Sequence, residues 1–161
     1  KDLDKNITLI WRNKKSEDDM EIIYKLAKFC KKNKINLFLS NNIKLALKLN
    51  LNGVYISAKN KDIRFNSFNI KKNFIFLGSA HNLQEVKVKK LQNVKEIFIS
   101  PIFKHKGRTP LGIHRCRYFF EDRSYQKIAL GGINKKNINL LLLTKFAGLA
   151  GINLFKKKGP E

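Results

Sequence analysis

The nine residues QKIALGGIN, from Gln126 to Asn134, form an apolar strand pattern that stops at two glycines and passes directly into a helix start. Because glycine has no Cβ, Gly131 and Gly132 would let a ligand approach the main chain. A helix capped by Asn134 would point unpaired N–H groups and a partial positive charge at the same place. The stretch therefore predicts a strand–turn–helix unit with an anion-binding turn, although an ordinary tight turn remains the alternative.

The same alternation of short apolar runs and longer helical patterns continues along the whole chain. Apolar runs separated by helices indicate strands buried on both faces, joined as parallel βαβ units with right-handed crossovers. Such a chain folds either as a doubly wound sheet or as a (β/α)₈ barrel. The predicted strands are Ile7–Trp11, Ile35–Leu39, Gly53–Ile56, Phe74–Leu77, Ile97–Ile99, Lys127–Leu130 and Ala147–Ile152.

The clearest helix lies between the first two strands. Ser16 and Asp19 have the spacing of a capping box at its start. Its predicted buried face consists of Ile22, Ile23, Leu26, Ala27, Phe29 and Cys30. Further helices are predicted at Asn42–Leu49, Leu83–Lys90, Ile113–Phe120 and Lys135–Leu143, and residues 57–73 are predicted to be irregular or to hold one short turn.

Length and composition favour one globular domain over residues 1–161, because 43% hydrophobic content is ample for a core. No run approaches the ~20 apolar residues of a membrane span, and no signal-peptide pattern opens the sequence. We therefore expect a cytoplasmic protein without a membrane partner. Cys30 and Cys116 lack the spacing of a metal site and are expected to be free thiols.

The net charge of +22 raises nucleic-acid binding as a hypothesis. However, the 34 basic residues comprise 28 lysines and six arginines scattered along the chain, and no nucleic-acid-binding motif accompanies them. The usage also fits a biased coding composition. Non-specific nucleic-acid binding is thus the weakest alternative, and the basic surface is expected to attract anionic, phosphorylated substrates.

Polar residues collect where the predicted strands end, which is where parallel βα architectures place their chemistry. In chain order these ends carry Arg12-Asn13-Lys14, Ser40-Asn41, Ser57 to Asn60, Ser79-Ala80-His81, Ser100-Pro101-Ile102-Phe103, Gly131-Gly132 and Gly151-Ile152-Asn153.

This ordered set resembles the thiamine phosphate synthase and TenI family of (β/α)₈ barrels over nearly the whole chain. Its most specific pieces are Ser79-Ala80-His81, Ser100-Pro101-Ile102-Phe103 followed by Leu111-Gly112, and Leu130-Gly131-Gly132-Ile133. Arg12-Asn13-Lys14 is similar to the end of the family's Gln-Leu-Arg-x-Lys strand, with Ile10 in place of the glutamine. In that alignment the family's first strand precedes residue 1. We therefore expect a (β/α)₈ barrel in which the first βα unit and the last helix are missing from this chain.

The resemblance implies thiamin biosynthesis and offers two chemistries. The synthase joins an aminopyrimidine diphosphate to a thiazole phosphate with Mg²⁺, whereas the TenI branch aromatises a thiazole carboxylate phosphate by proton transfer without a metal. The substrate phosphate is expected at Gly131, Gly132, Ile152 and Asn153. The other predicted substrate-binding residues are Arg12, Lys14, Asn41, Ser79, Ser100 and Arg108.

The carboxylates of a magnesium diphosphate site are not at the expected positions. The family's Asn-Asp pair corresponds to Ser40-Asn41, and its next acidic position corresponds to Asn60. Asp62 is two residues away and could substitute, but an exposed loop carboxylate is the simpler interpretation. We therefore expect no metal cofactor, with Mg²⁺ required only if the chain is an authentic synthase.

His81 corresponds to the catalytic histidine of the TenI branch and could pass a proton near neutral pH. Its alternative role is to hydrogen-bond the loop in which it lies. The favoured function is therefore a thiazole tautomerase-like enzyme acting on a small phosphorylated thiazole. Authentic thiamine phosphate synthase and a catalytically degenerate phosphate-binding barrel remain alternatives, and the sequence leaves homo-oligomer formation open.

Overall fold

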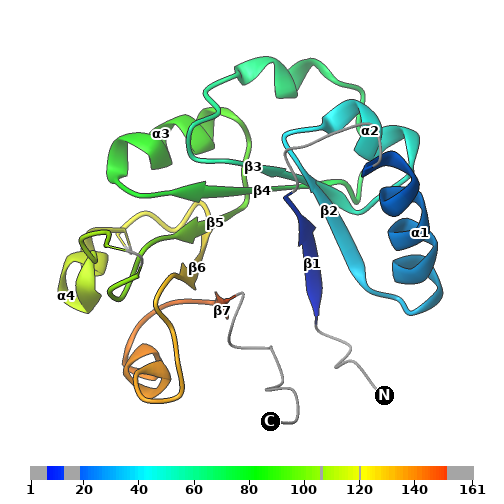
Figure 1. Ribbon diagram of the computed structural model, residues 1–161. Helices are drawn as coiled ribbons and strands as arrows, with labels where there is room; N and C mark the ends of the chain where they lie inside the picture. Colours follow the sequence, from blue (N-terminus) through cyan, green and yellow to red (C-terminus); the bar gives the residue numbers. More distant parts are fainter. Residues whose placement is uncertain (1–6, 13–18, 106, 120, 152–161) are drawn as a thin grey trace, which may run out of the picture.

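A computed structural model describes residues 7–12, 19–105, 107–119 and 121–151 of the chain. In these residues seven strands form one parallel sheet in which each strand pairs with the next one along the chain. The sheet curls into an open half-barrel (Figure 1). The strands are β1 (Thr8–Trp11), β2 (Asn36–Ser40), β3 (Gly53–Ile56), β4 (Ile75–Ala80), β5 (Glu96–Ile99), β6 (Gln126–Leu130) and β7 (Gly148–Ala150).

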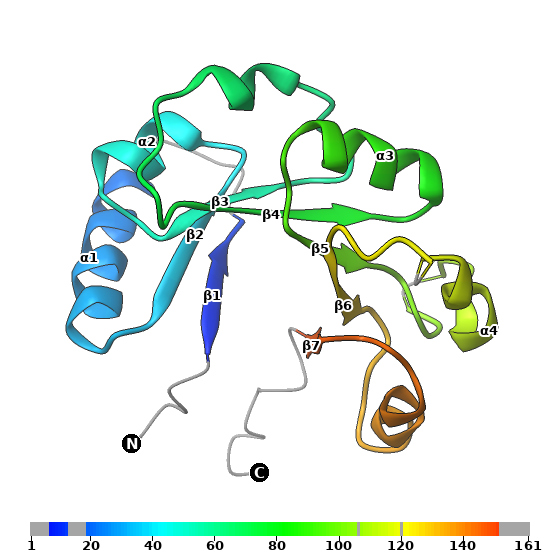
Figure 2. The same cartoon turned by 180° about the vertical axis from the view of Figure 1, so that it is seen from behind.

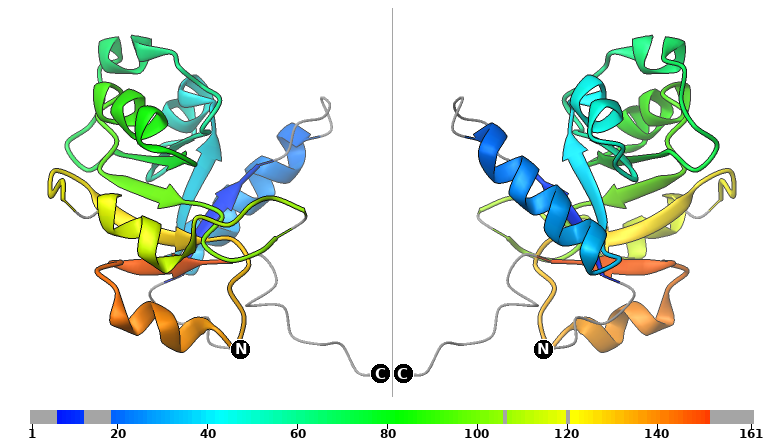
Figure 3. Two further views of the ribbon diagram at one scale, coloured as in Figure 1. Left: turned by 90° about the vertical axis from the view of Figure 1, so that its left-hand side faces the viewer. Right: turned by 90° about the vertical axis from the view of Figure 1, so that its right-hand side faces the viewer.

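The helices cover the convex face of the sheet, and the concave face is turned towards the barrel axis (Figures 1 and 2). Side views show the same curl and place α1 beside β1 and β2 (Figure 3). No described helix is long and apolar enough to span a membrane. The helical segments are α1 (Asp19–Lys32), α2 (Ile43–Lys48), α3 (Leu83–Leu91), α4 (Gly112–Cys116) and the 3₁₀ turns η1 (Ile63–Ser67), η2 (Arg117–Phe119) and η3 (Ile138–Leu143).

Two apolar layers hold this arrangement, because successive side chains of a strand point to opposite faces. The larger layer lies between the sheet and the helices and includes Leu39, Ile56 and Ile97. The smaller one fills the concave face, where the Tyr55 and Phe98 rings meet edge to face at 5.7 Å. Its members are Phe38, Tyr55, Leu77 and Phe98, with Ile10, Ile128, Leu130 and Ala150 packed against them.

All seven predicted strands are confirmed, and Gly53–Ile56 has the predicted bounds. The short turn predicted within residues 57–73 is also present, as η1. The eighth strand of a closed barrel stays a prediction, with β1 and β7 as the two edges of the described sheet.

The prediction of the last two helices is wrong in detail. The segment Ile113–Phe120 divides into α4 and η2. The segment Lys135–Leu143 keeps only the 3₁₀ helix η3. Asn134 caps the turn before it, as predicted: its side chain accepts from Lys136 N at 2.9 Å and its carbonyl accepts from Ile138 N at 3.0 Å. The α-helix predicted after Gly132 is thus a capped turn followed by η3.

The predicted buried face of α1 is only partly correct. Ile23 and Cys30 are buried, but Ile22 and Phe29 are 47% and 50% exposed. The helix lies over β1 and β2 at one edge of the sheet, so its outer flank has no neighbouring helix among the described residues. Ser16 of the predicted capping box lies outside the described residues. Both cysteines are free, as expected, and both are buried. Burial raises the pKa of Cys116 to about 11.

Candidate functional site

The carboxyl ends of all seven parallel strands meet at one rim of the half-barrel, which brings the predicted strand-end residues to a common edge. A serine follows each of four inner apolar side chains by two residues, so by the alternation of the strands it faces the same concave side. All four serines stand at predicted strand ends, but the predicted substrate-binding residues include only Ser79 and Ser100. The four pairs are Phe38 and Ser40, Tyr55 and Ser57, Leu77 and Ser79, and Phe98 and Ser100.

His81 follows β4 and is oriented by the end of β5. Its Nδ1 lies 2.6 Å from the carbonyl oxygen of Ser100 and 3.2 Å from the Ser100 hydroxyl oxygen. Because a carbonyl can only accept, Nδ1 carries the hydrogen and donates it, which leaves the lone pair of the neutral ring on Nε2. The hydrogen bond to Ser100 therefore fixes the orientation of the imidazole at the rim.

The helix start beside His81 is capped without using the imidazole. Asn82 Oδ1 accepts from Glu85 N at 2.8 Å, and Glu85 Oε2 accepts from His81 N at 2.7 Å. These two contacts fix the backbone of His81 relative to α3. Glu85 was missed by the sequence prediction, although its position three residues after Asn82 is the spacing of a capping box.

The Gly131-Gly132 turn passes under the loop that follows β5. The φ angles of the two glycines are +92° and +71°. A Cβ at Gly132 would lie 2.6 Å from the carbonyl oxygen of Phe103, so the close approach requires glycine. The N–H groups of Gly132 and Ile133 donate to no hydrogen bond with another described residue. The facing half of the predicted phosphate site, Ile152 and Asn153, lies outside the described residues.

The ends of β2 and β3 are tied together by the side chain of Asn41. Asn41 Oδ1 accepts from Ser57 N at 2.9 Å and from Asn60 Nδ2 at 3.2 Å. Its Nδ2 donates to the Ser57 hydroxyl oxygen at 3.1 Å. The resemblance predicts metal-binding carboxylates at positions 41 and 60. These positions are occupied by the amides of Asn41 and Asn60, which bond to each other.

Asp62 does not supply the missing carboxylate to the rim. Both of its oxygens bind Arg64, with a shortest contact of 2.7 Å, and Oδ1 also accepts from Arg64 N at the start of η1. The hydrogen bonds from Arg64 lower the pKa of Asp62 to about 2. No cluster of three His, Cys, Asp or Glu side chains occurs in the described part of the chain. Neither Asp62 nor the amides of Asn41 and Asn60 therefore offers a free carboxylate at the rim.

Of the predicted cationic residues, Arg12 lies over the concave layer. Its guanidinium carbon is 5.1 Å from the centroid of the Tyr55 ring, which is the geometry of a cation–π contact. Arg108 is exposed in the turn around Gly107, where its N–H donates to the carbonyl of His105 at 3.0 Å. Lys14 lies outside the described residues.

Two aromatic residues, Trp11 at the end of β1 and Phe103 in the loop after β5, do not belong to the inner layer. Both rings pack against the apolar layer on the outer side of the sheet. A flat ligand at the rim would therefore rest on the inner layer, in which Tyr55 and Phe98 supply the aromatic rings.

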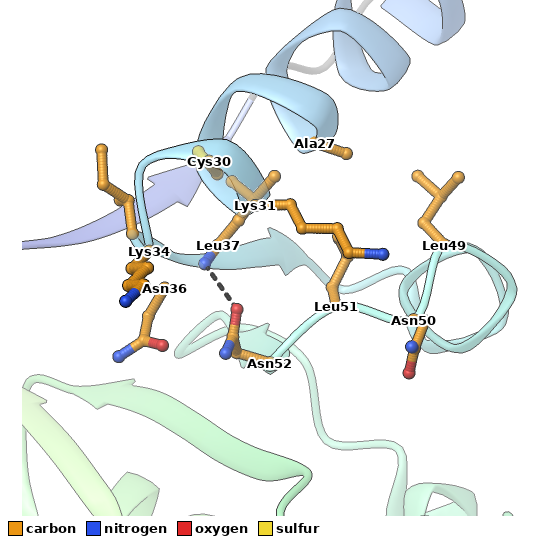
Figure 4. A pocket seen from close by; sticks show the side chains of 11 residues that line it. Ala27, Cys30, Lys31, Lys34, Asn36, Leu37, Leu49, Asn50, Leu51 and Asn52 are labelled. Carbon is orange, nitrogen blue, oxygen red and sulfur yellow. Dashed lines mark hydrogen bonds between the residues drawn. The ribbon is translucent and has the colours of Figure 1, made fainter.

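A separate cavity of about 350 Å³ lies at the end of the sheet opposite the rim, where β2 and β3 begin, between the C-terminal ends of α1 and α2 (Figure 4). Its polar lining consists of Lys31, Lys34, Asn36, Asn50 and Asn52. None of the predicted site residues lines this cavity, so the rim remains the candidate functional site.

Comparison with known proteins agrees with this geometry. The family model described as thiamine monophosphate synthase matches residues 3–155. A candidate thiamine-phosphate synthase of Aquifex aeolicus is 30% identical over 95% of this chain and 85% of its own length. The thiamine-phosphate synthase of Staphylococcus epidermidis is 25% identical, and the alignment covers 77% of this chain but only 60% of that enzyme.

Two solved structures share the fold. The thiamine phosphate pyrophosphorylase of Pyrococcus furiosus aligns with a TM-score of 0.73 and 23% identity, covering 91% of this chain and 72% of the other. The thiamine phosphate pyrophosphorylase of Bacteroides thetaiotaomicron aligns with a TM-score of 0.59 and 22% identity, covering 88% and 67%. With the family model matching nearly the whole sequence, this chain belongs to the thiamine monophosphate synthase family.

Proposed function

We propose that this chain acts in thiamin biosynthesis on a thiazole phosphate and that its reaction is a proton transfer of the TenI type. The observation that carries the proposal is the 2.6 Å hydrogen bond between His81 Nδ1 and the carbonyl of Ser100. It presents Nε2 as a base at the rim, and a histidine can take up and return a proton near neutral pH.

In this mechanism the substrate phosphate binds the N–H groups of Gly132 and Ile133, which donate to no other described residue. The thiazole ring lies on the inner aromatic layer, and the guanidinium of Arg12 pairs with the substrate carboxylate. His81 Nε2 removes a proton from one carbon of the non-aromatic tautomer and returns a proton to another. No atom is gained or lost, and the gain of aromaticity drives the reaction.

A reaction without a metal is supported by the amide pair at the ends of β2 and β3. Asn41 Oδ1 already accepts two hydrogen bonds, and the carboxylate of Asp62 is paired with Arg64. Neither side chain offers the free, charged oxygen that Mg²⁺ prefers.

The test is an assay with the thiazole carboxylate phosphate tautomer in the presence of EDTA, using the wild-type chain, His81→Ala and His81→Asn. Asparagine retains a donor for the Ser100 carbonyl but cannot act as a base. Both variants are expected to lower the rate by about 10²- to 10⁴-fold, the usual contribution of a general base. Equal rates in all three proteins would remove the catalytic role of His81.

The second candidate is an authentic synthase, and the names of the related proteins from Aquifex aeolicus and Staphylococcus epidermidis favour it. Its assay supplies aminopyrimidine diphosphate, thiazole phosphate and Mg²⁺ and measures thiamine phosphate. Magnesium-dependent product formation would establish this alternative. Thermal stabilisation by thiazole phosphate without either activity would indicate a binding protein.

A further inference from the structure

Two polar side chains, Lys89 and Gln92, are buried in the outer layer behind the rim, and the proposed reaction uses neither of them. Each is 0% exposed. Gly78 of β4 leaves room for the lysine, because a Cβ at this position would lie 2.9 Å from Lys89 Cδ. The interior of a central strand thus carries a glycine opposite a buried lysine, where an aliphatic residue would fill the space without a charge.

Both side chains bind the loop that follows β3. Lys89 Nζ donates to the carbonyl oxygen of Asn60 and to Gln92 Oε1, each at 2.7 Å. Gln92 Nε2 donates to the carbonyl oxygens of Asn60 at 3.1 Å and Asp62 at 2.9 Å. The end of α3 therefore holds two main-chain carbonyls that are about thirty residues away in sequence.

The partners of the Lys89 ammonium group are neutral. Burial lowers the pKa of Lys89 to about 8, and the charge of Glu85 opposes this shift. Removing a charge from water without a bonded counter-ion is costly, and hydrogen bonds to the charged group recover part of that cost. The folded state therefore favours the loop position in which the Asn60 carbonyl reaches the ammonium group.

Asn60 connects this buried pair to the rim. Its carbonyl oxygen faces Lys89 and Gln92, while its side-chain Nδ2 donates to Asn41 Oδ1 at 3.2 Å. The same Asn41 oxygen accepts from Ser57 N. A continuous path of hydrogen bonds thus runs from α3, through one loop residue, to the ends of β2 and β3.

We propose that Lys89 and Gln92 are positioning residues for the rim. From the outer side of the sheet they fix Asn60, and Asn60 in turn fixes Asn41 and Ser57. The buried pair thereby orders the ends of β2 and β3 without a metal. This role does not depend on the reaction at His81, so the two proposals can fail separately.

The test uses two nearly isosteric variants, Lys89→Met and Gln92→Met, in the full chain. Lys87→Met is the matched control, because Lys87 is an exposed lysine on the same helix. Amide hydrogen exchange is measured by mass spectrometry, and the side-chain amides of Asn41 and Asn52 are followed by NMR. Asn52 serves as the internal reference because it lies away from the rim, where strands β2 and β3 begin. Its Oδ1 accepts from Leu37 N at 3.0 Å.

Exchange in residues 57–62 is expected to accelerate by about tenfold or more in both methionine variants, the effect of losing roughly 1.4 kcal/mol of local protection. The Asn41 side-chain signals should shift, although Asn41 contacts neither substituted residue, while those of Asn52 and of the Lys87→Met control stay in place. Unchanged protection at 57–62 in a folded variant would overturn the proposal. Equal loss of protection throughout the chain would also overturn it, since that indicates a contribution to global stability alone. The neutral Gln92→Met substitution provides the decision if Lys89→Met does not fold.

Discussion

The two halves of the rim differ in how far their polar groups are already used within the protein. At the ends of β2 and β3, Asn41, Ser57 and Asn60 bond to one another. At the ends of β4 to β6, the described residues leave His81 Nε2 and the Gly132 N–H without hydrogen-bond partners. Because groups that lack an internal partner are the ones that a ligand can engage, we propose that the first half is scaffold and the second is the site of chemistry.

Both halves arise from the same βα geometry, so their difference lies in the side chains. A loop carboxylate at either amide position would attract a cation and repel a phosphate, whereas neutral amides can satisfy each other. The chain thus has a rim in which order at one side is built in and binding capacity is concentrated at the other.

The largest expected effect comes from Gly132→Ala, at the ends of β4 to β6. A Cβ would lie 2.6 Å from a main-chain oxygen, and the φ angle of +71° adds strain. Displacing this N–H from the phosphate should weaken thiazole phosphate binding by about 10- to 100-fold, corresponding to one charged hydrogen bond. Isothermal titration calorimetry measures this change.

Gly112→Ala is the matched control, because Gly112 has a φ angle of +70° with no atom within 4 Å of the added Cβ. Both variants should lose stability to urea through backbone strain, but only Gly132→Ala should lose affinity. Equal affinities in the two variants would mean that the glycine turn does not contact the ligand.

The next effect is on the free energy of unfolding and concerns Lys89, which binds the Asn60 carbonyl behind the ends of β2 and β3. The folded pKa of Lys89, about 8, lies below the usual lysine pKa of 10.5, so between these pH values the unfolded chain binds more protons. The penalty of burying the charge is therefore present in full below pH 8 and is relieved as the pH rises towards 10.5. Relative to Lys89→Met, the wild-type chain should gain on the order of 2–3 kcal/mol across this window.

Urea unfolding at pH 7.5, 9 and 10.5 measures this gain. Glu85 is the charged group that opposes the shift, so it must remain in all proteins compared. Lys87→Met should remain parallel to the wild-type chain at every pH. A constant difference between wild type and Lys89→Met would show that Lys89 is not held as a buried cation.

A smaller effect is expected when a carboxylate is introduced at position 41, after the end of β2. Asn41→Asp keeps the acceptor oxygen but loses the donor to Ser57, and it provides a ligand suited to Mg²⁺. Millimolar Mg²⁺ should stabilise this variant by about 0.5 kcal/mol, as expected for weak binding to the folded state alone. Asn52→Asp, at the opposite edge, is the control for a general effect of charge, and stabilisation of the wild-type chain by Mg²⁺ would contradict the scaffold assignment.

The smallest effect is expected for Asp62→Asn. The Asp62 carboxylate pairs with exposed Arg64, and such surface pairs contribute little at neutral pH. Since the pKa of Asp62 is lowered to about 2, any stabilisation is present above pH 4 and is lost as the pH falls towards 2. Activity at pH 7, with and without Mg²⁺, should equal that of the wild-type chain, and a selective loss in Mg²⁺ would identify Asp62 as a metal ligand.

The sheet could be predicted from the sequence because strands buried on both faces are continuous apolar runs, as in Gly53–Ile56. Helix bounds near the C-terminal end could not, because the apolar pattern of Ile138–Leu143 does not distinguish the 3₁₀ helix η3 from an α-helix. The exposed flank of α1 depends on its place at the sheet edge, which is a property of the whole fold.

Within the candidate site, the positions of His81 and of the glycine turn follow from their place directly after strands. The Asn41–Asn60 bond could not be predicted, because it depends on a backbone φ of +57° at Asn41 and on loop closure over nineteen residues. The burial of Lys89 could not be predicted, because most of the 28 lysines are expected at the surface. The one available signal was Gly78 within an apolar strand.

The most direct test of the divided rim is one NMR experiment in which the wild-type chain is titrated separately with thiazole phosphate and with Mg²⁺. Thiazole phosphate is expected to shift the amide signals of Gly132 and Ile133 and the ring signals of His81. Mg²⁺ is expected to leave the side-chain amide signals of Asn41 and Asn60 unchanged. Saturable magnesium shifts at Asn41 and Asn60, with no response of His81 to thiazole phosphate, would contradict it.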